Sequence, residues 1–134
     1  MYEELLKKAK QVSYYSHSPY NKFCVGAALL TRSGKIYTGC NIDNHGISSI
    51  CGERVAFTKA FSEGEPTKDK ENYVAIMVVG RKESSDKFEA AIPCGYCRQF
   101  MSEFVNKNFK VLTYEEGRIV EYTLEDLLPN SFDL

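Results

Sequence analysis

The sequence predicts an α/β fold with three layers (α/β/α), in which a five-stranded mixed sheet is flanked by helices. Three observations lead to this prediction. Segments with apolar residues at helical spacing alternate along the chain with short strand-like runs. The run 73–80 (YVAIMVVG) is apolar enough for the centre of a sheet. The last two strand-like segments are joined only by residues 115–118, and so short a connection permits only an antiparallel pair.

The first half of the chain predicts a helix followed by a β-hairpin. Over residues 2–15 apolar side chains recur at helical spacing with lysines between them, as in an amphipathic helix. The run 23–31 consists of apolar and small residues, which is typical of a buried strand. Residues 35–42 alternate as a second strand, and the turn signal Ser33-Gly34 between the two runs favours a hairpin.

The second half predicts the remaining helices and strands. After an irregular loop, 43–50, we expect a helix over 51–62, with Ser48 or Ser49 as its cap. Beyond the central strand a charged loop leads to another helix over 94–105. The other predicted elements are strands over 110–114 and 119–123 and a final helical turn over 124–128.

Length and charge limit the classes of protein that fit. The 134 residues suit one domain, which we expect to span 1–134. The formal net charge of −1 argues against nucleic acid as a partner, because nucleic-acid binders carry a basic excess. No apolar run approaches the ~20 residues that span a bilayer, and the N-terminus is charged from Glu3 without the apolar stretch of a signal peptide. We therefore expect a cytoplasmic protein with no membrane partner.

The cysteines gather in two segments that suit a metal site. Five cysteines in a reducing cytoplasm indicate metal binding, catalysis or burial, and not disulfides. The segments are CGER at 51–54 and PCGYCRQ at 93–99. Each places a cysteine at the expected start of a helix, where free N–H groups and the helix dipole favour thiolate. Cys94 and Cys97 lie one helical turn apart and can hold one ion together, with Cys51 as the third ligand.

The number of thiolates indicates a catalytic zinc site. Three are one short of a closed structural site, and catalytic zinc keeps its fourth position for water, whose pKa falls to about 7 in well-studied sites. Glu53, two residues after a ligand, is the expected proton carrier. Because three thiolates more than cancel the charge of the ion, Arg54 and Arg98 are expected to contact the sulfurs. We predict one Zn²⁺ per chain.

Less specific interpretations remain for several of these residues. A C-x-x-C pair alone also occurs in redox motifs and structural zinc sites. Cys24 and Cys40 are expected to be small buried hydrophobes, although either could close a four-thiolate site. His17 and His45 are interpreted as polar loop residues.

The two cysteine segments resemble the signature of the cytidine deaminase family, C-A-E-R followed by P-C-G-x-C-R-Q. The resemblance places Arg54, Arg98 and Gln99 around the metal ligands. It covers nearly the whole chain, because three further stretches are similar to family motifs. These stretches are FCVGAAL at 23–29, GKIYTGCNI at 34–42 and LLPNSF at 127–132.

The resemblance implies roles for residues outside the metal site. In the small homotetrameric, zinc-dependent class of the family, Phe23 would pack near the base and Asn41 would bind the ribose hydroxyls. Asp43 stands where the family has glutamate, and Gly52 replaces the usual alanine while keeping the N–H donor. Phe132 would reach a neighbouring subunit's active site, or else pack on its own sheet.

The implied function is hydrolytic deamination of cytidine and deoxycytidine to uridine and deoxyuridine, with release of ammonia, in pyrimidine salvage. The expected partner is a small-molecule nucleoside. The segment from Asn41 to Cys51 is one residue shorter than in the family and lacks its tyrosine, so a related cytosine nucleoside such as the antibiotic blasticidin S is the nearest alternative. A non-catalytic zinc-binding module is a remote alternative, and nucleic-acid editing is the weakest.

Overall fold

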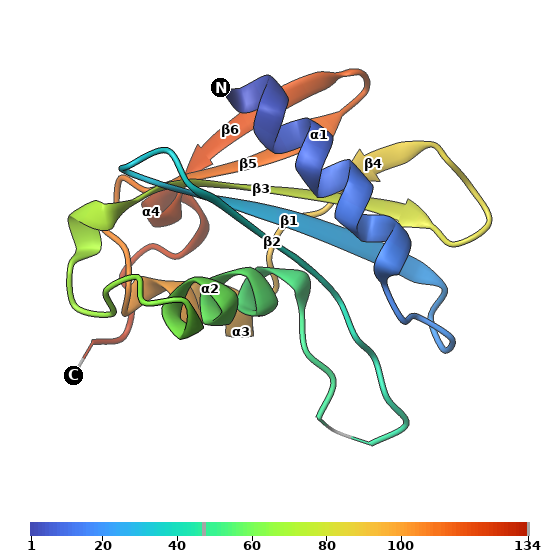
Figure 1. Ribbon diagram of the computed structural model, residues 1–134, viewed down its shortest axis with the longest axis horizontal. Coiled ribbons are helices and arrows are strands. Elements are labelled where there is room, and N and C mark those ends of the chain that lie inside the picture. Colours follow the sequence, from blue (N-terminus) through green and yellow to red (C-terminus); the bar gives the residue numbers. More distant parts are fainter. Residues whose placement is uncertain (47, 134) are drawn as a thin grey trace.

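The computed structural model describes residues 1–46 and 48–133, and its elements form three layers (Figure 1). Helix α1 (Tyr2–Val12) covers one face of a mixed sheet, and α2 (Gly52–Ser62) and α3 (Gly95–Ser102) lie against the other. The short helix α4 (Leu124–Leu127) lies on the side of α2 and α3. The predicted α/β/α arrangement is confirmed. In the described part of the chain, no helix has the length and apolar character needed to cross a bilayer.

The sheet has six strands where the sequence predicts five. Its main path runs β2-β1-β3-β5-β6, and β3 pairs in parallel with β5 while the other neighbours are antiparallel. The strands are β1 (Phe23–Thr31), β2 (Ile36–Cys40), β3 (Tyr73–Lys82), β4 (Phe88–Ala90), β5 (Lys110–Glu115) and β6 (Arg118–Thr123). The extra strand, β4, returns antiparallel along the last part of β3. It lies in the predicted charged loop, and three residues are too few to display an alternating pattern.

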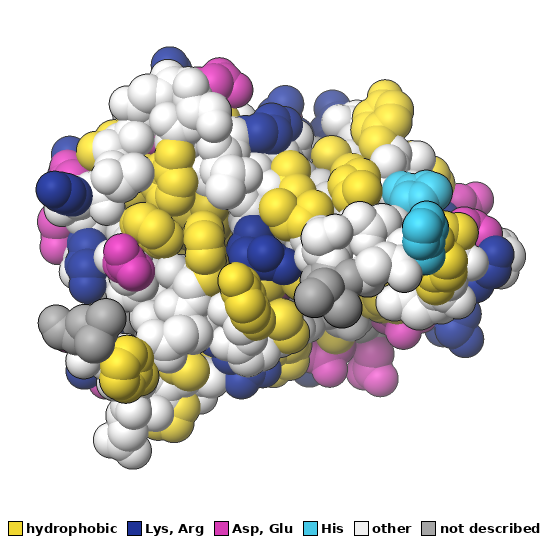
Figure 2. Space-filling view, turned by 90° about the horizontal axis from the view of Figure 1, so that it is seen from below, with side chains coloured by type: hydrophobic (Ala, Val, Ile, Leu, Met, Phe, Trp, Pro, Cys, Tyr) yellow, Lys and Arg dark blue, Asp and Glu magenta, His cyan; other side chains and the backbone are white. Residues whose placement is uncertain are grey.

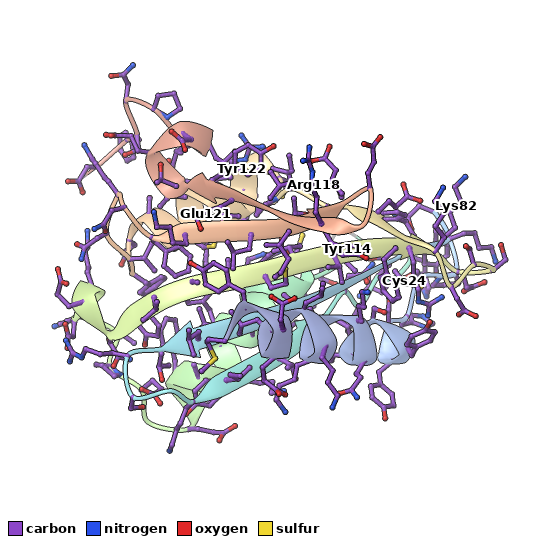
Figure 3. The ribbon with its side chains drawn as sticks, turned by 90° about the horizontal axis from the view of Figure 1, so that it is seen from above. Cys24, Lys82, Tyr114, Arg118, Glu121 and Tyr122 are labelled. Atoms are coloured by element: carbon purple, nitrogen blue, oxygen red, sulfur yellow. The ribbon has the colours of Figure 1, made fainter. Side chains whose placement is uncertain are left out.

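One face of the sheet is sealed by α1. Leu5 and Ala9 are fully buried and belong to a core cluster with Ala28 of β1 and Met77 of β3. The helix ends at Val12, three residues before the predicted end, because the chain continues as a 3-10 turn over Ser13–Tyr15. Figure 3 views this face, with the β5–β6 hairpin and its labelled side chains Tyr114, Arg118, Glu121 and Tyr122 beside the helix.

The opposite face carries the larger core, centred on Phe57 of α2. Its ring lies 5.7–6.2 Å from the rings of four aromatic neighbours, which come from the helix itself, the sheet and the segments around α3. These neighbours are Phe61, Tyr73, Phe100 and Phe109. Because this aromatic cluster contains side chains of both α2 and α3, it fixes the two helices under the sheet next to each other.

The helices α2 and α4 begin in different ways. The N-cap of α2 is Cys51 itself, so neither Ser48 nor Ser49 caps this helix as predicted. Ser49 instead hydrogen-bonds within the preceding loop, where its hydroxyl accepts from the backbone N–H of Asn44. The last helix, α4, begins with a capping box in which Thr123 and Asp126 each accept from the other's backbone N–H.

Candidate metal centre and active site

Three cysteines converge where the first turns of α2 and α3 meet beneath the sheet. Cys51 is the N-cap of α2, Cys94 is the N-cap of α3, and Cys97 lies in the first turn of α3. Both cap residues have extended backbone, which turns the chain into each helix with its free N–H groups at that end. The three sulfurs lie within 4.8 Å of one another.

This geometry suits zinc. A tetrahedral zinc with Zn–S bonds near 2.3 Å holds its sulfurs ~3.8 Å apart, so the three thiols need only a small contraction. The alternative in which Cys24 or Cys40 completes a four-thiolate site is not supported, because the metal-ligand cluster found among the described residues contains three cysteines. Cys24 and Cys40 are buried, as predicted, and Cys24 is visible in Figure 3 near Lys82.

The thiols differ in burial and in protonation. Cys97 is fully buried, Cys51 is half-buried and Cys94 is exposed, so the cluster opens to solvent on the Cys94 side. The pKa of the Cys51 thiol is lowered to about 5, mainly by a hydrogen bond from Cys97 and further by Arg54. The same hydrogen bond and burial raise the pKa of Cys97. One thiolate is therefore favoured at neutral pH even before an ion binds.

Glu53 lies in the first turn of α2, directly after the ligand segment. Its side chain is 4% exposed. Burial raises the pKa of this carboxyl to about 7, and the negative charge of Cys51 raises it further. A hydrogen bond from the backbone N–H of Glu53 and the positive charge of Arg54 lower the same pKa, but they do not outweigh burial. Gly52, between Cys51 and Glu53, is buried with its Cα against the backbone of β2. A carboxyl that is buried beside a candidate metal ligand has the position of a proton carrier.

The three polar side chains expected around the ligands occupy different places. Arg54 donates to the Cys51 sulfur at 3.9 Å, as predicted for it. Arg98 contacts backbone and not sulfur, since it donates to the carbonyls of Pro93 at 2.7 Å and Leu127 at 2.8 Å. It thereby ties the turn before Cys94 to α4. Gln99 donates to the carbonyl of Phe132 at 3.0 Å and to the hydroxyl of Ser102 at 3.3 Å.

Asn41 is buried and its amide is already satisfied by the chain. Its Oδ1 accepts from the Val25 backbone N–H at 2.8 Å and from the Ser16 hydroxyl at 2.5 Å. Its Nδ2 donates to the carbonyl of Phe23 at 3.1 Å and to the Ser18 hydroxyl at 3.2 Å. A primary amide has two donor hydrogens and two acceptor lone pairs. Contact with a ribose hydroxyl would therefore replace one of these bonds.

Asp43 lines a hollow beside this network. The hollow has a volume of about 540 Å³ and lies between the loop before β1 and the loop after β2. The side chains around it are Tyr20, Asn21, Asp43, Asn44, His45 and Ser49. Ile47, in the same predicted sugar-binding loop, lies outside the described residues. The hydroxyls, amides and carboxylate of this lining can hydrogen-bond a polyhydroxy group.

Phe132 does not pack on its own sheet. Its side chain is 67% exposed on the C-terminal segment, beside α3. Figure 2 views the face that carries α2 and α3, where hydrophobic side chains emerge in several groups. The exposed apolar residues also include Ile92 and Tyr96, which flank Cys94 in sequence.

Sequence reasoning missed several residues that shape the site. Tyr96 stands at the variable position of the C-x-x-C segment, and its ring lies under the guanidinium of Arg54. Gly80 of β3 lies against the ring of Phe23. Ser16 and Ser18 hold the Asn41 amide. Only Tyr96 offered a signal, because an aromatic residue between two ligands of a predicted metal is placed to contact the site.

Comparison with known proteins agrees with this geometry. Residues 1–113 match the family profile described as the cytidine and deoxycytidylate deaminase zinc-binding region. A cytidine deaminase of Sporosarcina psychrophila is 42% identical over 132 residues, covering 97% of this chain and 90% of that protein. The crystal structure of cytidine deaminase from Burkholderia pseudomallei superposes with a TM-score of 0.84 at 32% identity, covering 98% and 99% of the two chains.

A relative named for a different substrate also matches. The blasticidin-S deaminase of Bacillus cereus is 34% identical over 110 residues, covering 81% of this chain and 76% of that protein. The profile match spans both cysteine segments, including the buried Glu53 of the first. The chain therefore belongs to the zinc-dependent cytidine and deoxycytidylate deaminase family.

Proposed function

We propose that this chain hydrolyses cytidine and deoxycytidine to uridine and deoxyuridine and releases ammonia. The observation that carries the proposal is the convergence of three thiols from two helix N-termini beside one buried carboxyl, Glu53. Three ligands leave a zinc ion one open position, which suits catalysis better than a purely structural role. Membership of the deaminase family supports the reaction class.

Cys51, Cys94 and Cys97 are the residues that would hold the ion. Zinc, when bound, supplies Lewis-acid activation of water at neutral pH. The Glu53 carboxylate would accept one proton from the attacking water and give it to the ring nitrogen, and would then accept the second proton from the new hydroxyl and give it to the amine. The water oxygen bonds to the ring carbon that carried the amine, the carbon–nitrogen bond breaks, and ammonia leaves. Glu53 returns to its starting protonation state.

The remaining site residues bind and orient the nucleoside in this proposal. Phe23 packs against the base, and Asp43 accepts from hydroxyls of the sugar at the hollow that it lines. Asn41 is a candidate for a sugar contact, and its hydrogen bonds to Phe23 and Val25 also support the backbone next to the base. The Gly52 backbone N–H, at the start of α2, is the further expected donor to the substrate.

We also propose a homotetramer that acts in the cytoplasm in pyrimidine salvage. The exposed Phe132 supports assembly, because an aromatic side chain with 67% exposure leaves apolar surface that a neighbouring subunit would cover. It would reach the active site of a neighbouring subunit. If so, dilution to monomers removes turnover, whereas a monomer with full specific activity would contradict this part of the proposal.

The direct test uses purified, zinc-loaded protein with cytidine and with deoxycytidine. We expect uridine or deoxyuridine to appear together with an equal amount of ammonia. Protein that carries zinc but converts neither nucleoside would contradict the proposal. Such a result would leave a related cytosine nucleoside as substrate, or the non-catalytic zinc-binding module, as the remaining candidates.

Blasticidin S is the second candidate substrate. Two observations favour it: the identity to the blasticidin-S deaminase and the shortened loop from Asn41 to Cys51. Competition between cytidine and the antibiotic separates the candidates. A kcat/KM for blasticidin S above that for cytidine would make the antibiotic the preferred substrate.

A further inference from the structure

Tyr96 connects the two ligand-bearing helices over the thiol cluster. It occupies the gap between Cys94 and Cys97 at the start of α3, and its side chain is 68% exposed. The guanidinium carbon of Arg54, in the first turn of α2, lies 4.5 Å from the centre of the Tyr96 ring. The pair therefore links α2 to α3 at the point where both helices supply thiols.

Arg54 in turn contacts the ligands. One terminal nitrogen, Nη2, lies 3.9 Å from the Cys51 sulfur and 3.4 Å from the carbonyl of Ser49. A positive donor beside thiolates favours their charged form, which is the form that binds a metal.

Arg54 is held in this place at some cost. Its Nε is buried and has no hydrogen-bond partner among the described residues. An unpaired buried donor opposes the observed position of the side chain, because water could satisfy the same group outside. The hydrogen bonds of Nη2 and the aromatic face of Tyr96 are the contacts that keep the Arg54 side chain in place instead of letting it move into solvent. A cation over an aromatic face is attracted by the ring quadrupole.

We propose that Tyr96 is a positioning residue that holds Arg54 against the ligand thiolates and thereby strengthens zinc binding. The proposal rests on the zinc site of the proposed function and goes beyond it by assigning a role to the variable residue between two ligands. Tyr96 acts through Arg54 and not on the metal itself. Its contribution must therefore disappear when Arg54 is removed.

The test measures zinc dissociation constants by competition with a chromophoric chelator, using the full chain. Tyr96→Leu removes the aromatic face and keeps an apolar side chain, whereas Tyr96→Phe keeps the face and removes the hydroxyl. We expect Tyr96→Leu to weaken zinc binding about two- to fivefold, as exposed cation–π pairs do, and Tyr96→Phe to match the wild-type chain. Arg54→Gln is expected to weaken binding about tenfold, as loss of such outer partners does.

The double variant decides the mechanism. In the Arg54→Gln background, Tyr96→Leu should cause no further weakening. An equal weakening in both backgrounds, or binding by Tyr96→Leu equal to that of the wild-type chain, would overturn the proposal. Melting of the metal-free proteins is the fold control, because a change at an exposed side chain should leave it unaltered.

The outcome is separable from that of the proposed function. A wild-type chain that binds zinc, with the expected pattern among the variants, supports the role of Tyr96 even if cytidine is not converted. A wild-type chain that takes up no zinc overturns both proposals.

Discussion

Gly39 of β2 lies directly against the carbonyl oxygen of Gly52 in the first turn of α2. A Cβ at Gly39 would stand 2.4 Å from that oxygen and 2.5 Å from the backbone nitrogen of Ala56. Both are backbone atoms, so neither can move without moving the helix. This contact determines the distance between α2 and the sheet, and with it the positions of Cys51 and Glu53.

Gly39→Ala should therefore disturb both the fold and the site. We expect the free energy of unfolding to fall by about 3 kcal/mol, near the upper end for overpacked cores. A helix displaced by ~1 Å should lower kcat/KM about a hundredfold. Urea denaturation and steady-state kinetics measure the two effects. Thr38→Ala, which removes only an exposed hydrogen bond from Lys59, is the control and should cost less than about 1 kcal/mol.

Gly80→Ala, in contrast, should weaken substrate binding and leave the stability of the fold nearly unchanged. Here a Cβ would stand 2.3 Å from Cζ of Phe23, and the end of a flexible ring can turn away at little cost. We expect KM to rise about fivefold, the range of an aromatic contact, with kcat and the melting temperature nearly unchanged. In a Phe23→Leu background the same change should leave KM where it is. A fall in kcat with constant KM would contradict the role of Phe23 at the base.

Removal of one thiol distinguishes metal ligands from buried cysteines. We expect Cys94→Ser to lose bound zinc and to melt at a lower temperature, because ligands from two helices no longer share an ion. Cys40→Ala is the matched control: it should keep one zinc per chain and cost about 1 kcal/mol of stability through lost core volume. Metal analysis and calorimetry provide the readouts. Full zinc content in Cys94→Ser would remove this residue from the ligand set.

Arg81 should contribute to stability without contributing to catalysis. It is 6% exposed, and its guanidinium lies 3.9 Å from the centre of the Tyr14 ring. It also donates to Ser13, to the last carbonyl of β3 and to two carbonyls of the loop after it. Arg81→Leu leaves these acceptors unpaired, so we expect a loss of about 2–4 kcal/mol with normal kcat. Arg32→Leu breaks an exposed ion pair with Asp69 and should cost less than about 1 kcal/mol. Equal losses in the two variants would contradict this account.

The sequence predicted the layers of the fold because periodicity reports burial. The apolar run at 73–80 became the central strand β3, and the short link at 115–118 did force an antiparallel pair. Strand β4 escaped prediction because Phe88–Ala90 is too short for a pattern and depends on pairing with β3. The cap of α2 was misplaced for a related reason: Ser48 and Ser49 are good caps locally, but the helix begins where Gly52 meets β2.

The site was predictable as far as spacing determines chemistry. Two cysteine segments and Glu53 were sufficient to predict a zinc cluster, since ligand types and helix starts limit the geometry. The role of Arg98 was not predictable, because its carbonyl partners at Pro93 and Leu127 come together only in the folded chain. The saturation of the Asn41 amide likewise depends on a loop, around Ser16 and Ser18, whose path no periodic pattern reports.

The measurement that tests the central claim most directly compares cytidine conversion by the zinc-loaded wild-type chain and by Glu53→Gln. Glutamine keeps the size of the side chain and cannot carry the proton, so zinc content should be unchanged while conversion falls at least about a hundredfold. Conversion within tenfold of wild type, at equal zinc content, would contradict the assignment of Glu53 as the proton carrier and with it the proposed mechanism.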